Sequence, residues 1–175
     1  MTVECSRATL RGMSHPRIEA FRAPFLPALL LSLGRLQSCP VSAEDGYVPF
    51  TGTTNVWHEG FARFDYVMDE VTLAVTPFPA PEGERFAVKE PPKGQRRCIV
   101  VVPKTPAAGR PWSWQGCYWD HEPQTEVDLL RRGFHVVFIT PDPGKPWDAF
   151  YTWLVEQHGL AKKPAFIGMS KGGRE

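Results

Sequence analysis

The second half of the chain carries apolar segments whose length is typical of strands in a sheet covered on both faces. Residues 98–102 and 134–140 are almost continuously apolar, as expected for fully buried strands. Two shorter apolar segments, 112–115 and 164–167, predict two further strands.

Two segments between these strands have the spacing of helices. Residues 147–158 repeat apolar side chains every three to four positions, and residues 123–132 begin with a proline, which suits a first helical turn. Gly133 and Gly159 follow them as C-terminal caps. Because strands that alternate with helices form parallel sheets, residues 97–175 predict an α/β domain with a mostly parallel sheet.

The preceding part of the chain, residues 44–96, has a different pattern. Residues 61–68 and 71–76 alternate apolar and polar side chains, which predicts two half-buried strands. They would add an antiparallel N-terminal strand pair to the sheet. A polar segment, 44–60, precedes them, and the proline-rich segment 77–92 predicts a loop.

Composition and charge exclude several classes of protein. The chain has 175 residues, of which 20 are basic and 19 acidic, for a formal net charge of +1. That balance argues against nucleic acid as a partner, because nucleic-acid binding needs a basic patch. Proline contributes 18 residues, about twice its average share, which excludes a coiled coil or a helical bundle.

The first 43 residues have the features of a secretory signal. Four arginines precede an apolar stretch at 23–34, and small residues at 41–43 offer a cleavage site. The apolar stretch is about 12 residues long, whereas a membrane span needs about 20. We therefore expect a secreted or periplasmic protein that keeps no integral membrane segment after signal removal. The alternatives are an N-terminal extension without order and, on a weaker match at 36–39, a lipoprotein cleavage box.

Two cysteines, Cys98 and Cys117, remain after removal of residues 1–43. Export would permit them to pair. Nothing in their spacing requires a disulfide, and Cys98 lies in a segment predicted to be a buried strand. The sequence favours buried free thiols.

The motif that carries chemistry is Gly168-x-Ser170-x-Gly172, directly after the last predicted strand. This G-x-S-x-G pattern is typical of a nucleophile elbow, in which a strained turn lifts a serine hydroxyl above the sheet. Ser170 is then the catalytic nucleophile, and the backbone N–H of Lys171 stabilises the oxyanion. The alternatives are a plain glycine-rich turn and a phosphate-binding loop. The second fails because lysine follows the serine instead of preceding it.

A second oxyanion donor is expected from the loop after the strand at 112–115. The backbone amides of Gly116 and Cys117 are the candidates, with a plain packing turn as the alternative. No histidine follows Ser170, so the catalytic base is not assigned, and His121 is retained as a possible site-lining residue. Asp142 and Asp148 are interpreted as turn and helix-cap residues. No metal site or cofactor is predicted.

Five segments together resemble secreted bacterial α/β-hydrolases of the esterase/prolyl-oligopeptidase-like superfamily. They are residues 98–104, 110–123, 129–139, 147–160 and 162–173. The resemblance implies the N-terminal half of an α/β-hydrolase fold, with a mostly parallel sheet and an antiparallel N-terminal strand pair. It also implies a Ser-His-Asp triad in which Ser170 is the nucleophile. The acid and the histidine would lie beyond Glu175, so we expect the 175-residue chain to be inactive by itself.

These observations favour a serine hydrolase, esterase- or peptidase-like, that forms an acyl-enzyme on Ser170. Its partner would be a small-molecule ester or a peptide-like substrate. The alternative is a non-catalytic secreted α/β module or a vestigial fragment. In that case aromatic residues could bind carbohydrate or peptide, although core and loop packing is the favoured interpretation; they are Trp112, Trp114, Tyr118, Trp119 and Trp147.

Overall fold

The fold is organised around one mixed sheet of seven strands. The computed structural model describes residues 46–79 and 90–173. Its strands are β1 (Thr54–Trp57), β2 (Phe61–Asp69), β3 (Val75–Pro77), β4 (Gln95–Val102), β5 (Trp112–Gln115), β6 (His135–Ile139) and β7 (Ala165–Ile167). Its helices are α1 (Gln124–Arg131), α2 (Lys145–Thr152), the π-helix η1 (Trp153–Gln157) and the 3-10 turn η2 (Ser170–Gly173). The expected signal segment, 1–43, lies outside the described residues.

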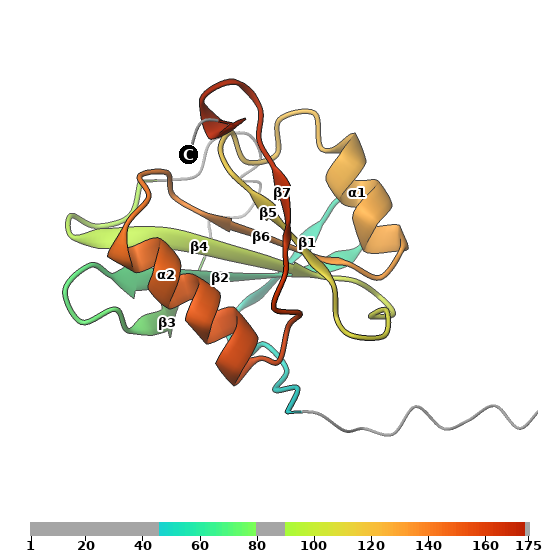
Figure 1. Ribbon diagram of the computed structural model, residues 1–175, viewed down its shortest axis with the longest axis horizontal. Coiled ribbons are helices and arrows are strands. Elements are labelled where there is room, and N and C mark those ends of the chain that lie inside the picture. Colours follow the sequence, from blue (N-terminus) through green and yellow to red (C-terminus); the bar gives the residue numbers. More distant parts are fainter. Residues whose placement is uncertain (1–45, 80–89, 174–175) are drawn as a thin grey trace, which may run out of the picture. The chain divides into compact units, whose positions relative to one another are not determined.

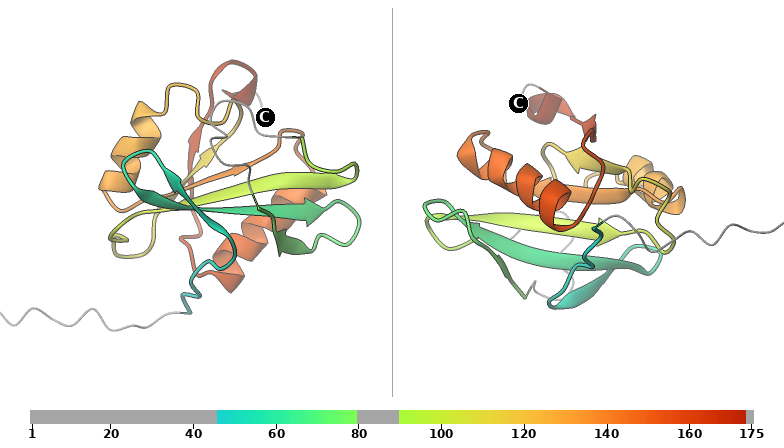
Figure 2. Two further views of the ribbon diagram at one scale, coloured as in Figure 1. Left: turned by 180° about the vertical axis from the view of Figure 1, so that it is seen from behind. Right: turned by 60° about the horizontal axis from the view of Figure 1, so that its bottom comes forward.

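Alternate residues of the central strands point to opposite faces of the sheet and build two hydrophobic clusters. On one face, Cys98 and Val100 pack with Phe150 of α2. On the other face, Ile99 and Val101 pack with Leu130 of α1. In Figure 1, α2 crosses in front of the strands, and the view from behind in Figure 2 places it beyond them.

The expected mostly parallel α/β-hydrolase sheet is wrong. The strand order is β1-β2-β4-β6-β5-β7, with β3 on β2, and only the β5–β6 and β5–β7 pairs are parallel. The other four pairings in the described residues are antiparallel, including that of β4 with β6. A parallel pair needs a crossover between its strands, and this part of the chain supplies only two short helices for that purpose. The sheet is therefore mixed, and its helices are few.

Several predicted elements agree with the structure. Strands over 61–68, 98–102, 112–115, 134–140 and 164–167 are confirmed as β2, β4, β5, β6 and β7. The helices over 123–132 and 147–158 are present as α1 and as α2 with η1. Gly133 and Gly159 have positive φ, at 87° and 66°, as expected for C-terminal caps. Cys98 and Cys117 are buried free thiols, as predicted.

Two predictions near the N-terminal strands are wrong. The strand expected over 71–76 begins only at Val75, because the Asp69 carboxylate accepts backbone N–H bonds from Val71 (3.0 Å) and Thr72 (2.7 Å) and holds a turn there. Conversely, β1 lies in the segment 44–60, for which no element was expected. The segment is polar because β1 is an edge strand, and Trp57 is its only buried residue.

A buried charge cluster joins the two longest strands. Asp65 of β2 accepts hydrogen bonds at 2.7 Å from the guanidinium of Arg63 and from that of Arg97 on β4. The side chains of Asp65 and Arg97 are fully shielded from solvent. Removing one partner of such a cluster leaves buried charge behind, which costs far more than breaking an exposed pair.

We predict that Asp65→Asn lowers the free energy of unfolding by about 3 to 5 kcal/mol, because both guanidiniums lose their shared carboxylate. The matched control is Asp128→Asn. It breaks the exposed ion pairs of Asp128 with Arg131 and Arg132 and should cost less than about 1 kcal/mol. Urea unfolding followed by circular dichroism measures both. Equal losses in the two variants would contradict the assignment.

Two histidines belong to the core beneath the N-terminal segment. His135 of β6 is fully buried, and its ring lies near those of Tyr47 and Phe50. Burial lowers its pKa to about 4. His158 stacks on Phe50 and contacts the carbonyl of Val48 through Nδ1 at 2.6 Å, and burial lowers its pKa as well. His158 therefore packs in the core, where burial favours the neutral form of its ring.

A histidine with a lowered native pKa makes stability fall with acid. The unfolded chain takes up a proton below about pH 6.5, whereas native His135 resists protonation down to about pH 4. Stability from this group is therefore complete above pH 6.5 and is lost as the pH falls toward 4.

We predict that, between pH 7.5 and pH 5, the wild type loses about 2 kcal/mol more stability than His135→Leu. Urea unfolding at the two pH values measures the difference. His121→Leu, which alters an exposed side chain, should keep the pH dependence of the wild type. An identical pH dependence in wild type and His135→Leu would show that His135 does not cause it.

Candidate active site

The candidate site lies at the carboxyl ends of two neighbouring parallel strands. β5 and β7 pair in parallel, with Gln115 opposite Ile167. Gly116 and Gly168 follow these two residues, so the turn after β7 and the loop after β5 leave the sheet at the same edge (Figure 1). This edge is where ligands bind in sheets with parallel strands.

Ser170 occupies a strained turn. Its φ is +52°, in the left-handed region, which costs a residue with a Cβ about 1 to 2 kcal/mol. It begins the 3-10 turn η2, its side chain is exposed, and Lys171 follows it in the same turn. Within the turn, the N–H of Gly172 donates to the carbonyl of Met169 at 2.9 Å. A sharp, strained turn directly after a strand is the geometry that a nucleophile elbow requires.

Three glycines let the turn and the loop touch backbone to backbone. A Cβ on Gly168 would lie 2.5 Å from the carbonyl oxygen of Gly172, and one on Gly116 would lie 2.6 Å from the same oxygen. A Cβ on Gly172 would lie 2.7 Å from the Cβ of Cys117. The two outer glycines of the sequence motif therefore have a steric reason, and the motif packs on the loop expected to complete the oxyanion site.

The two backbone amides of that loop differ in whether they already have a hydrogen-bond acceptor. The N–H of Gly116 donates to the carbonyl of Ile167 at 2.9 Å, so it is already used to extend the β5–β7 pairing. The N–H of Cys117 has no acceptor among the described residues. The Gln115 side chain holds the Cys117 carbonyl through a 2.9 Å bond from Nε2. Of the two predicted donors, Cys117 is the one that can serve an oxyanion.

No general base is in place in the described part of the chain. No hydrogen bond there joins a histidine to Ser170, and His121 is exposed on the loop, with its backbone N–H bonded to the carbonyl of Tyr118. Asp142 lies in the turn after β6, as expected. Asp148 does not cap α2, because Gly144 precedes the helix and Asp148 lies in its first turn.

Sequence reasoning missed one contact beside the site. His58, in the turn between β1 and β2, contacts Asp120 of the β5–α1 loop, with Nε2 and Oδ1 2.5 Å apart. Asp120 is buried, and both residues have positive φ, at 39° and 60°. The two positions are 62 residues apart, so no local pattern could have paired them.

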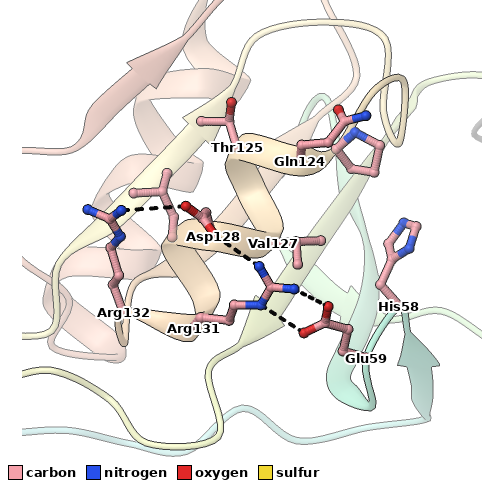
Figure 3. A pocket seen from close by; sticks show the side chains of 10 residues that line it. His58, Glu59, Gln124, Thr125, Val127, Asp128, Arg131 and Arg132 are labelled. Atoms are coloured by element: carbon pink, nitrogen blue, oxygen red, sulfur yellow. Dashed lines mark hydrogen bonds and ion pairs between the residues drawn. The ribbon is translucent and has the colours of Figure 1, made fainter. Parts of the chain in front are cut away.

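A groove of about 820 Å³ lies between this turn and α1 (Figure 3). Arg131 lines it and pairs with both Glu59 and Asp128. The bonds from Arg131 lower the pKa of Glu59. A smaller cavity of about 140 Å³ borders the loop at Tyr118 and Trp119. The ion pairs of Arg131 with Glu59 and Asp128 are exposed, and exposed ion pairs add little stability. This side of the groove is therefore a solvated, charged surface.

Four of the five aromatic residues singled out in the sequence lie in the core. Trp112, Trp114, Trp119 and Trp147 are each less than a tenth exposed, and only Tyr118 of the five is exposed. They pack on one another and on the sheet, as in the contact of Trp114 with Trp147 at 5.1 Å between ring centres. The four tryptophans are therefore core residues, as the packing interpretation of the cluster expects.

The described residues offer neither a metal site nor a membrane-spanning helix. In residues 46–79 and 90–173 no cluster of histidine, cysteine and acidic side chains could hold a metal ion. No helix in these ranges is both long and apolar enough to cross a bilayer. Comparison with known proteins adds no family: no family model matches the chain, and neither the curated proteins nor the solved structures contain a significant match.

We predict that Gly168→Ala loosens the turn, because its Cβ cannot fit beside the Gly172 carbonyl, whereas Gly173→Ala is tolerated with its nearest contact at 3.6 Å. Hydrogen exchange measured by NMR should show the amides of Gly116 and Gly172 exchanging about tenfold faster or more in Gly168→Ala, a change of about 1.4 kcal/mol. In Gly173→Ala their rates should match the wild type. Equal rates in all three proteins would contradict the steric role.

Proposed function

We propose that the protein is a serine-nucleophile acyl-transfer enzyme of the esterase or peptidase type. One observation carries the proposal: Ser170 stands in a left-handed turn after β7, and that turn packs backbone to backbone on Gly116 and Cys117. A serine on a strained turn, with a backbone N–H that has no acceptor among the described residues on the loop against which the turn packs, supplies a nucleophile and an oxyanion donor for attack on a carbonyl. The proposal rests on this local geometry and not on the class of sheet.

The proposed reaction has two steps, acylation of Ser170 and hydrolysis of the acyl-enzyme. Ser170 Oγ bonds to the carbonyl carbon and gives its proton to a base, and the carbonyl electrons move to the oxygen, where the N–H groups of Cys117 and Lys171 bind it. Collapse breaks the bond to the alkoxide or amine, which takes up a proton and leaves an acyl-enzyme. Water then adds to the acyl carbon and releases the acid, which restores the serine hydroxyl.

The substrate class follows from the exposure of Ser170. Because the serine lies on an exposed turn and not at the bottom of a deep cavity, the proposed substrates are small esters or peptide-like carbonyl compounds. No base contacts Ser170 in the described residues, so turnover by the 175-residue chain should be slow unless a base is supplied.

We predict that a fluorophosphonate probe labels Ser170 slowly and that added imidazole accelerates the labelling by about tenfold or more, because imidazole supplies a general base that no described residue places at Ser170. Mass spectrometry of the intact protein gives the rate, and peptide mapping gives the position. Ser170→Ala should abolish both the adduct and the imidazole effect.

The control is the same protein unfolded in urea, in which the turn is lost and labelling of Ser170 should fall to the rate of a free serine. An adduct spread over other residues, or one that persists in Ser170→Ala, would overturn the proposal.

A further inference from the structure

The loop that carries Cys117 is held from outside by the turn between β1 and β2. The loop, residues 116–122, contains three residues with left-handed backbone: Tyr118, Asp120 and Glu122, with φ between 50° and 60°. A segment with this much unfavourable backbone needs contacts that fix it. Among the described residues, two of these contacts come from neighbouring positions at the end of β1 and the start of the turn, Trp57 and His58.

The first contact is apolar and the second is polar. The rings of Trp57 and Trp119 lie 5.4 Å apart and share a hydrophobic cluster. Beside them, His58 Nε2 lies 2.5 Å from Oδ1 of Asp120, whose side chain is only 2% exposed. A carboxylate oxygen accepts hydrogen bonds, and a buried one needs a donor, so the Nε2–H of His58 is the side-chain donor that the geometry offers to Asp120.

We propose that His58 is a positioning residue for the Ser170 site. By donating its Nε2–H to Asp120 it fixes the loop, and the loop in turn holds the Cys117 amide against Gly172, two residues from the nucleophile. His58 does not touch the reacting atoms. This inference rests on the proposed function, because the amide matters only if an oxyanion forms on a group bonded to Ser170.

The neighbouring residue provides a matched control. Glu59 lies in the same turn, but it pairs with Arg131 of α1 across the groove and not with the loop (Figure 3). If the turn merely stabilised the fold, loss of either contact would have the same kind of effect. If His58 positions the loop, only loss of its bond to Asp120 alters the reaction at Ser170.

The choice of variants isolates the hydrogen bond. In His58→Gln the side-chain amide N–H reaches about the place of Nε2, whereas in His58→Asn it falls short, at about the place of Nδ1. His58→Ala removes the donor altogether. The measured quantities are the maximal rate constant of fluorophosphonate labelling, kinact, and the half-saturating probe concentration, KI, both with imidazole present, and hydrogen exchange of a peptide that covers 116–122.

We expect His58→Ala and His58→Asn to lower kinact by about tenfold to a hundredfold with KI changed less than about twofold, since a displaced oxyanion donor affects the transition state and not probe binding. His58→Gln should restore kinact to within about threefold of the wild type, and Glu59→Gln should leave it unchanged. Exchange in 116–122 should rise in the Ala and Asn variants alone.

The outcomes separate this inference from the function beneath it. Wild-type protein that labels at Ser170, with kinact equal in all His58 variants, overturns the positioning role and leaves the function standing. Equal losses in His58→Gln and His58→Ala also overturn it, because the hydrogen bond would then not be the cause. Absence of labelling at Ser170 in the wild type overturns both. Should His58→Ala fail to fold, the comparison of His58→Asn with His58→Gln decides the question alone.

Discussion

The parallel pairing of β5 with its two neighbours is the interaction on which the rest of the arrangement depends. β5 is buried along its whole length, and it aligns the ends of β6 and β7 at one edge of the sheet. Gly116 continues that pairing by donating its N–H to Ile167, which brings the loop after β5 against the turn after β7. Because Gly116, Gly168 and Gly172 have no side chains, the two segments meet, and the turn that begins at Ser170 packs on Cys117 through Gly172.

Much of the fold can be predicted from the sequence, because a buried strand requires a run of consecutive apolar residues. The apolar runs at 98–102 and 134–140 locate β4 and β6 to within a few residues. The direction in which a strand pairs with its neighbour is not visible in its own residues. The antiparallel pairing of β4 with β6 therefore contradicts the expected mostly parallel sheet. Asp69 gives a second, local example. Residues 71–76 alternate as a strand would, but the hydrogen bonds that Asp69 accepts from two backbone N–H groups hold the start of this segment in a turn.

The candidate site divides along the same line. The serine turn can be predicted because its requirements lie within five consecutive residues, and the glycine contacts now give those requirements a steric cause. The use of the Gly116 amide by Ile167 depends on strand register, and the contact of His58 with Asp120 depends on two turns that meet in space. Neither contact can be predicted from the residues that surround it in the sequence. The buried tryptophans make a related point, because an aromatic cluster in sequence has the same composition whether it lies in the core or on the surface.

The structure of the protein after reaction with a fluorophosphonate tests the central claim most directly. If Ser170 is a nucleophile served by the neighbouring loop, phosphorus is bonded to its Oγ, and the phosphonyl oxygen lies about 2.7 to 3.1 Å from the backbone nitrogens of Cys117 and Lys171. A phosphonyl oxygen directed into solvent, with the Cys117 N–H bonded elsewhere, contradicts the assigned oxyanion site. An adduct on another residue contradicts the nucleophile itself.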